Sequence, residues 1–254
     1  MRPSPVFLGI LALVAAGAVM AAFGDATAFF TNYRDPLLIA GVVIFVAAGW
    51  VASLSLHEFG HAMVAYRGGD ASVAHKGYLS LDVRKYTDPV LSIILPLFFL
   101  VLGGIPLPGG AVWINRGALR SRATSSWVSL AGPLSNLAVG AAVTLVTSLV
   151  PMAHGLYMAM SLLALLQVVA FLLNILPIPG LDGWGAIEPF LSPQAREFGA
   201  RVRPWAPMVL FAILWFFRPA NEALFGGSYA IFDLLGGDRD AAAEGFRAFM
   251  FWRY

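Results

Sequence analysis

The residues with the clearest capacity for chemistry are His57, Glu58 and His61, which occur in the run His-Glu-Phe-Gly-His. Positions i and i+4 of a helix lie on one face, so both imidazoles can bind the same zinc ion. Glu58, one position along, can accept a proton from a water bound to that zinc. The alternative is a buried polar cluster that only holds helices together. The pattern predicts a hydrolytic site with one zinc ion per chain.

A catalytic zinc usually has three protein ligands and one position left for water. The chain has no cysteine, so the third ligand must be a histidine or a carboxylate. Asp182 is the strongest candidate, because it follows an apolar run that Pro177 and Pro179 interrupt. Proline ends a helix, which would leave the Asp182 carboxylate on irregular backbone at the edge of the membrane. The alternative is a loop aspartate that caps a turn.

A third set of residues, Gly132, Asn136 and Gly140, recurs every four positions. On a helix this spacing gives a stripe of small residues that lets a neighbouring helix approach closely. Asn136 would present its amide from that seam, where it could bond a substrate carbonyl or a developing oxyanion as a catalytic residue. The alternative is a structural hydrogen bond between helices.

The composition is that of a membrane protein. Of 254 residues, 59% are hydrophobic and 12% charged, and the mean hydropathy is +0.78. A soluble domain is about half apolar and about a quarter charged, so a soluble globular protein is excluded. Within lipid, ionisable groups at depth are costly and usually functional, which disfavours a merely structural polar cluster. The net charge of +2 is typical of cytoplasmic loops facing anionic lipid, and we expect no nucleic-acid partner.

Apolar runs of about 20 residues predict an all-α polytopic membrane protein with about five to six transmembrane helices. The expected helices cover residues 5–23, 36–66, 126–150, 156–177 and 204–217, with a weaker candidate at 222–236. The first run could be a cleaved signal peptide, but a retained span is favoured because no exported soluble domain follows it. The chain then divides into a first span with an external loop (1–35), a catalytic membrane core (36–190), and C-terminal membrane helices with a short tail (191–254).

The distribution of Arg and Lys predicts the orientation in the membrane. Positive charge concentrates in segments 67–88, 111–125 and 178–203, whereas 24–35 has one arginine and 151–155 has neither Arg nor Lys. The positive-inside rule therefore places the first three segments in the cytoplasm. The candidate zinc ligands then meet toward the cytoplasmic side of the bilayer.

The chain between 67–88 and 111–125 must enter the membrane and return, because both segments are expected on the same side. Its apolar part, 89–102, has 14 residues, too few at about 1.5 Å each to cross a core about 30 Å thick. We expect 89–110 to form a re-entrant hairpin. The residues after it alternate in polarity and could offer a β-type edge to an extended substrate: Ala111, Val112, Trp113, Ile114 and Asn115. The alternative is a connector that faces lipid.

Taken together, three motifs resemble the site-2 protease family of intramembrane zinc metalloproteases. They are His-Glu-Phe-Gly-His at 57–61, Gly-Pro-Leu-Ser-Asn at 132–136, and Asn-x-x-Pro-x-Pro-x-Leu-Asp-Gly at 174–183. They occur in the family's order and cover residues from about 40 to 185, whereas the first span and everything beyond about 190 match loosely.

The resemblance implies roles for these residues. His57, His61 and Asp182 would be the zinc ligands, Glu58 the catalytic acid and base, and Asn136 a neighbour of the active site. It also supports a partly β-like re-entrant loop between the metal-binding helix and the helix that carries Asn136.

The expected function is that of a multi-pass intramembrane zinc metalloprotease in the bacterial cell membrane. Its partners would be the lipid bilayer and a transmembrane protein substrate, cut near the cytoplasmic side. The alternative is a non-proteolytic membrane protein that binds or transports zinc. A transporter should have polar residues along a whole pathway, whereas here the ionisable residues expected within the membrane gather at one depth, which favours the protease.

Overall fold

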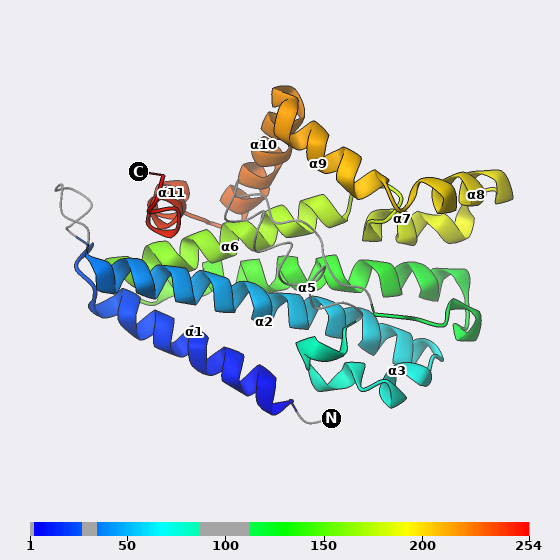
Figure 1. The fold of residues 1–254 in the computed structure, drawn as a ribbon, viewed down its shortest axis with the longest axis horizontal. Coiled ribbons are helices and arrows are strands. Elements are labelled where there is room, and N and C mark those ends of the chain that lie inside the picture. Colours follow the sequence, from blue (N-terminus) through cyan, green and yellow to red (C-terminus); the bar gives the residue numbers. More distant parts are fainter. Residues whose placement is uncertain (1–2, 27–34, 87–111, 254) are drawn as a thin grey trace.

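The computed structural model describes residues 3–26, 35–86 and 112–253, and these residues form helices and no strands. Four helices are long and apolar enough to cross a membrane: α1 (Pro5–Phe23), α2 (Pro36–Gly68), α5 (Arg122–Leu149) and α6 (His154–Asn174). They lie side by side in one bundle (Figure 1). Each matches an expected span to within four residues, and the chain is a multi-pass membrane protein.

Short polar signals in the sequence set where three of these helices begin. The Ser4 side chain accepts a hydrogen bond from a backbone N–H of the first turn of α1, and Asp35 and Ser121 do the same for α2 and α5. Pro5 and Pro36 follow two of these caps, at positions where the missing amide hydrogen costs nothing. The chain thus enters the first, second and third long helices through N-terminal caps.

Glycine lets α1 approach its neighbours closely. A Cβ atom on Gly17 would lie 2.5 Å from the backbone nitrogen of Phe45 in α2. Side chains at Gly41 of α2 and Gly155 of α6 would collide with the backbone of Ala21. Small residues at such contacts are how membrane helices pack, because lipid supplies no hydrophobic force between them. Helix α1 therefore packs against both α2 and α6; its retention stays a prediction.

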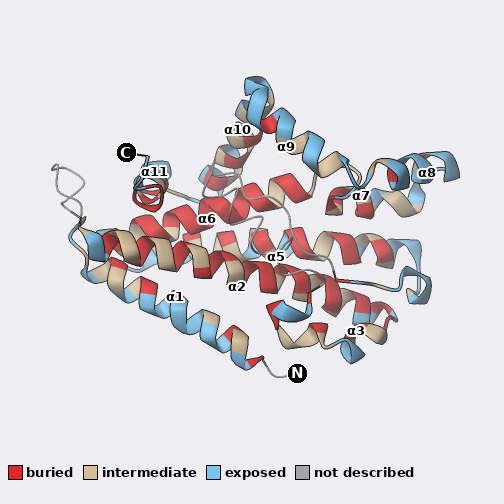
Figure 2. Ribbon diagram, viewed as in Figure 1, coloured by how far each residue is buried: buried red, intermediate tan, exposed pale blue. Residues whose placement is uncertain are grey.

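Helices α2 and α6 form the centre of the bundle, and most of the α6 surface is buried (Figure 2). Helix α6 packs against α2 and α5, and further along the chain against α10 (Arg218–Leu234) and α11 (Arg239–Phe249). Many large apolar side chains of α1 and α5 remain exposed, as expected of helices that face lipid.

The last expected membrane segments form one bent pair. Helix α9 (Ala206–Phe216) and α10 meet at an angle of 95°. The break is at Phe217, just before Arg218-Pro219, because proline lacks the amide hydrogen needed to continue a helix. The runs expected at 204–217 and 222–236 are therefore the two halves of this pair.

The two ends of the α9–α10 pair lie near the two ends of α6. A Cβ atom on Gly180, just beyond the end of α6, would lie 2.9 Å from Pro207 near the start of α9. Beyond the end of α10, Asp238 accepts a hydrogen bond at 3.0 Å from the Tyr157 hydroxyl in the first turn of α6. If the pair is counted as one broken span, the described part of the chain has five candidate membrane spans. Five is the lower end of the expected range of about five to six.

After α10 comes α11, an amphipathic helix. Its small-residue face, which includes Ala241, Ala242 and Gly245, is buried, and a side chain at Gly245 would collide with the carbonyl of Met158 in α6. The end of the chain is therefore part of the packed structure, because this face covers apolar surface of α6 and α2.

Short helices at the other end of the bundle position the candidate site. They are α3 (Ser72–His75), η2 (Tyr78–Ser80), η3 (Val83–Lys85), η5 (Arg116–Ala118), α7 (Asp182–Ile187), η6 (Glu188–Phe190) and α8 (Pro193–Val202). The expected hairpin 89–110 and Ala111 lie outside the described residues. The residues that flank the gap lie against the C-terminal half of α2: the Tyr86 hydroxyl donates to the Ser55 carbonyl, and the Val112 N–H donates to Glu58.

Candidate metal centre and catalytic residues

His57, His61 and Asp182 converge on one point. The two Nε2 atoms lie 3.0 Å apart, His57 Nε2 lies 3.2 Å from Asp182 Oδ2, and His61 Nε2 lies 3.4 Å from Asp182 Oδ1. Both histidines are buried near the end of α2, and Asp182 is half-buried at the start of α7. The structure thus brings together the three ligands expected from the sequence, and they could hold a metal ion.

The spacing of these atoms fits zinc. Two ligand atoms about 2.0–2.1 Å from a tetrahedral zinc are about 3.3 Å apart. The three measured separations, 3.0, 3.2 and 3.4 Å, are all close to that value. Two imidazoles and one carboxylate are also the donor set of catalytic zinc sites, which keep a fourth position for water.

Helix α5 leaves room for the centre at Gly132. A Cβ atom there would lie 2.5 Å from His57 Nε2 and would collide with His61 Nε2. No larger residue fits at this position without displacing the imidazoles. The sequence placed Gly132 in a helix-packing stripe; the structure places it directly against the ligand atoms.

A backbone carbonyl orients His61. The Nδ1 atom of His61 lies 2.6 Å from the carbonyl oxygen of Val128 in α5, so Nδ1–H donates and the Nε2 lone pair is free to bind metal. Pro133, inside α5, has no amide hydrogen, which leaves the Ser129 carbonyl without its helical donor and loosens this turn.

Asp182 is the first residue of the six-residue helix α7, and Gly180 before it has a φ of +101°. The irregular backbone expected here is confined to the loop that precedes Asp182. Burial raises the pKa of the Asp182 carboxyl, but the two imidazoles outweigh this effect, and its pKa is lowered overall. The carboxylate faces the imidazoles, which favours a ligand over a turn cap.

Glu58 lies beside the candidate ligands with 2% of its surface exposed. The backbone N–H of Val112 donates to its Oε2 atom at 3.1 Å. The candidate acid and base is therefore in direct contact with the segment expected to receive the substrate.

Residues 112–115 form no strand in the described part of the chain; side chains from α2 and from the turns on either side of α3 bind their backbone groups. The Trp113 carbonyl accepts from Lys76 Nζ at 3.0 Å, and Asn115 N–H donates to Asp70 at 2.7 Å. Val112 and Ile114 pack in an apolar cluster, whereas Trp113 is exposed. The segment is thus held against α2 and the turns beyond it, and its role in substrate binding stays a prediction.

Asp70 is the buried anchor of that segment. Burial raises the pKa of its carboxyl, but hydrogen bonds from the Ser72 hydroxyl and the Asn115 N–H outweigh this and lower the pKa. Asp70 could not be singled out from the sequence, because its bond to Asn115 joins residues 45 apart and its bonds to Ser72 are those of an ordinary turn.

Asn136 lies one turn beyond Gly132 on the same buried face of α5. Its side chain makes no hydrogen bond to another residue in the described part of the chain. An interhelical bond, the alternative for this residue, is thus not found among the described residues.

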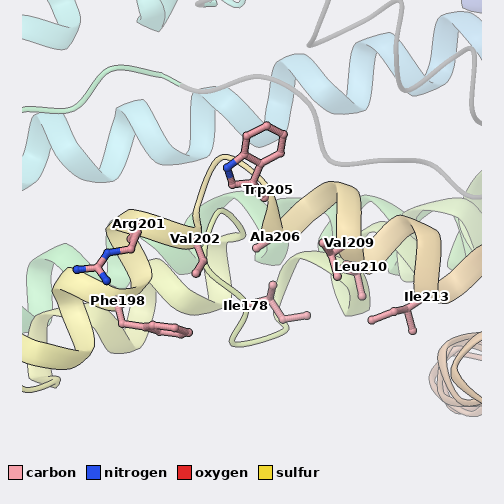
Figure 3. Close-up of a pocket in the computed structure, with 9 residues that line it drawn as sticks. All are labelled: Ile178, Phe198, Arg201, Val202, Trp205, Ala206, Val209, Leu210 and Ile213. Carbon is pink, nitrogen blue, oxygen red and sulfur yellow. The ribbon is translucent and has the colours of Figure 1, made fainter.

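An apolar cavity of about 600 Å³ lies apart from the metal centre, between the loop after α6 and helices α8 and α9. Figure 3 shows Ile178 on the loop side, with Val202 and Leu210 from the helices and Trp205 from the turn between them. No candidate catalytic residue lines it, so it is not the reaction site.

Comparison with known proteins identifies relatives over almost the whole chain. A Mycobacterium tuberculosis protein provisionally named zinc metalloprotease Rip2 is 44% identical over 99% of this chain and 95% of its own length. The Mycolicibacterium smegmatis protein of the same name is 41% identical over the same shares. A Bacillus subtilis protein provisionally named zinc metalloprotease YwhC is 31% identical over 78% of this chain and 89% of its own length. No family model matches the chain, and no solved structure matches it significantly.

Proposed function

Because the chain belongs to the site-2 protease family and is a membrane zinc metalloprotease, we propose that it cuts membrane-spanning proteins near the cytoplasmic side of the bilayer. The proposal rests on one juxtaposition: Glu58, next to the ligand residue His57 on α2, accepts a hydrogen bond from the backbone of Val112. Peptide hydrolysis requires a proton acceptor and a metal centre close to the place where the substrate peptide binds.

His57, His61 and Asp182 would hold the zinc ion, with Val128 fixing the orientation of His61. When bound, zinc polarises the scissile carbonyl and lowers the pKa of a bound water toward about 7. Glu58 takes the proton from the attacking water and later gives it to the leaving amine.

The substrate would bind as an extended segment. A helix keeps its carbonyl groups in its own hydrogen bonds, so a transmembrane substrate must unwind locally before it can be cut. We expect this extended peptide to bind at residues 111–115, where its backbone would form hydrogen bonds with the backbone edge of that segment. Asn136 would donate its amide to the substrate carbonyl as negative charge develops on the oxygen.

The proposed orientation follows from the end of the bundle at which the site lies. The last turn of α2, the start of α5 and helices α7 and α8 share that end, together with Arg67, Arg122 and Arg201. The positive-inside rule makes this end cytoplasmic, and the bacterial relatives suggest the cell membrane as the location.

Zinc transport is disfavoured by the distribution of ionisable residues. Within α1, α2, α5 and α6, ionisable residues occur in the His57–His61 motif or near helix ends (Arg67, Arg122 and His154). In the bent pair, Arg218 and Glu222 form an exposed ion pair beside the break. A transport pathway would need polar residues at other depths.

The test begins with capture of a substrate by the Glu58→Gln variant in membranes, with identification by mass spectrometry. The captured protein is then placed with wild-type enzyme in liposomes that contain a zinc indicator. We expect a cut within or beside its transmembrane segment and no zinc flux. Glu222→Gln, an exposed acid on α10, serves as the control and should cut normally. Zinc flux without hydrolysis would contradict the proposal.

A further inference from the structure

Arg116 has no role in the steps above, yet it connects the parts of the site. It lies in η5, directly after residues 112–115. Its Nη1 atom donates to Ser125 Oγ at 2.9 Å and to the carbonyl of Gly185 at 3.4 Å, and Nη2 donates to Ser129 Oγ at 3.3 Å. One guanidinium thus binds α5 and α7 together.

Both contact points adjoin the metal centre. Gly185 follows Asp182 by three residues in α7, and Ser125 and Ser129 flank Val128, whose carbonyl holds His61. A Cβ atom on Gly185 would lie 2.6 Å from Ser129 Oγ and 3.1 Å from Arg116 Nη2, so the fit leaves no space for a side chain. Movement of the guanidinium would therefore affect α7, which carries Asp182, and the turn of α5 whose Val128 carbonyl orients His61.

Helix α7 depends on such contacts. It has six residues and follows an irregular loop, and helices this short are not stable on their own. Its last carbonyl groups have no donor within the helix. Arg116 supplies a donor to the Gly185 carbonyl, and Ser126 Oγ supplies one to Ala186 at 2.5 Å.

A carboxylate completes the network. Glu188, just after α7, lies 4.0 Å from Arg116 and accepts from Arg203 at 3.1 Å. The Arg116 charge is thus compensated in a partly exposed position, and Glu188 also joins α7 to the end of α8.

We propose that Arg116 is a positioning residue that holds Asp182 at binding distance from His57 and His61. This inference deepens the proposed function, because the residue that fixes the ligand helix also follows the proposed substrate segment. Arg116 does not touch the ligand atoms; it acts through α7 and α5.

The test measures the zinc affinity of the purified full-length protein in detergent, by competition with a chelating indicator. Arg116→Gln is expected to weaken zinc binding about tenfold, the lower limit seen when groups supporting a metal ligand are removed. Arg116→Lys should lose less, because an ammonium keeps hydrogen-bond donors but not the fork geometry. Arg122→Gln, the same change of charge at an exposed position of α5, should bind zinc like wild type.

A double-mutant cycle separates positioning from general destabilisation. Ser125→Ala with Ser129→Ala removes two of the acceptors and should weaken zinc binding in the same direction. Adding Arg116→Gln should then cost less than it does alone, because the residues act through the same contacts. The metal-free forms of Arg116→Gln and Arg122→Gln should unfold at similar temperatures.

Wild-type zinc affinity in Arg116→Gln, or full additivity in the cycle, would overturn the inference. If Arg116→Gln does not fold, the zinc affinities of Arg116→Lys and of the double serine variant are compared with that of the wild type. Unchanged zinc affinity in both variants overturns the inference. Zinc binding needs no substrate. A wild-type protein that binds zinc but cuts no captured substrate would therefore defeat the proposed function and leave the Arg116 result standing.

Discussion

The backbone N–H of Val112 donates a hydrogen bond to the buried carboxylate of Glu58 at 3.1 Å. This bond joins the proposed acid and base to the segment proposed to receive the peptide. The carboxylate is therefore oriented by the backbone next to which the substrate would bind. A shift of the segment on substrate binding would alter the position of Glu58 directly.

Val112→Pro removes that N–H donor and is expected to lower kcat/KM about 10- to 100-fold, because a hydrogen bond to a charged group contributes about 1.5–3 kcal/mol. Zinc content should not change, since no ligand is affected. Val112→Ala keeps the N–H and is the matched control. Equal activity of the two variants on a captured substrate would show that this bond does not orient Glu58.

Gly132→Ala should abolish zinc binding, because the new methyl group would lie 2.5 Å from His57 Nε2 and would collide with His61 Nε2. Gly140→Ala, two turns along the same helix, is the control. Its methyl group would meet Gln167 Cβ at 3.2 Å, a contact that a small shift relieves. Metal analysis of the purified variants is expected to find zinc in Gly140→Ala alone. A full complement of zinc in Gly132→Ala would show that α5 does not adjoin the ligands in this way.

Asp182→Ala should lower both zinc occupancy and activity, because two imidazoles alone would remain as protein ligands. Asp182→Asn should have a milder effect, since an amide oxygen can still approach the metal. The control is Asp240→Ala, which removes an exposed acid from the first turn of α11. Full zinc occupancy and activity in Asp182→Ala would reopen the search for a third ligand.

Cysteine labelling tests the topology, since the natural chain has no cysteine. Cysteines at Lys85 and Ala118 flank the segment expected to re-enter, and both should react with an impermeant maleimide only after the inner face is opened. A cysteine at Ala153, between α5 and α6, should react in intact cells. Labelling of position 118 from outside would contradict both the re-entrant segment and the cytoplasmic site.

The sequence was sufficient to predict the four long helices and the convergence of His57, His61 and Asp182. Apolar runs are local signals, so the spans followed from them. The cap at Ser121 is local too, but the apolar run alone places the start of α5 at 126, four residues late. The i, i+4 spacing of His57 and His61 is also local, and it fixes their common face before any packing is known.

The remaining features depend on contacts between distant segments. Nothing near Arg116 in the sequence indicates that it reaches Gly185, and nothing near Val112 indicates its bond to Glu58. The break at Phe217 is explained by Pro219, but the 95° angle depends on contacts between distant segments, such as the packing of α10 against α6. A pattern in one segment cannot specify such contacts.

Zinc content and peptide hydrolysis of Glu58→Gln, measured on the same purified sample, test the central claim most directly. The variant keeps all three ligands and changes the proton acceptor alone. We expect one zinc ion per chain, as in the wild type, and a loss of hydrolysis of about 10²–10⁴-fold on a captured substrate, the usual contribution of general acid–base catalysis. Wild-type hydrolysis, or loss of zinc together with activity, would contradict the role of Glu58 as the proton acceptor of a zinc-dependent protease.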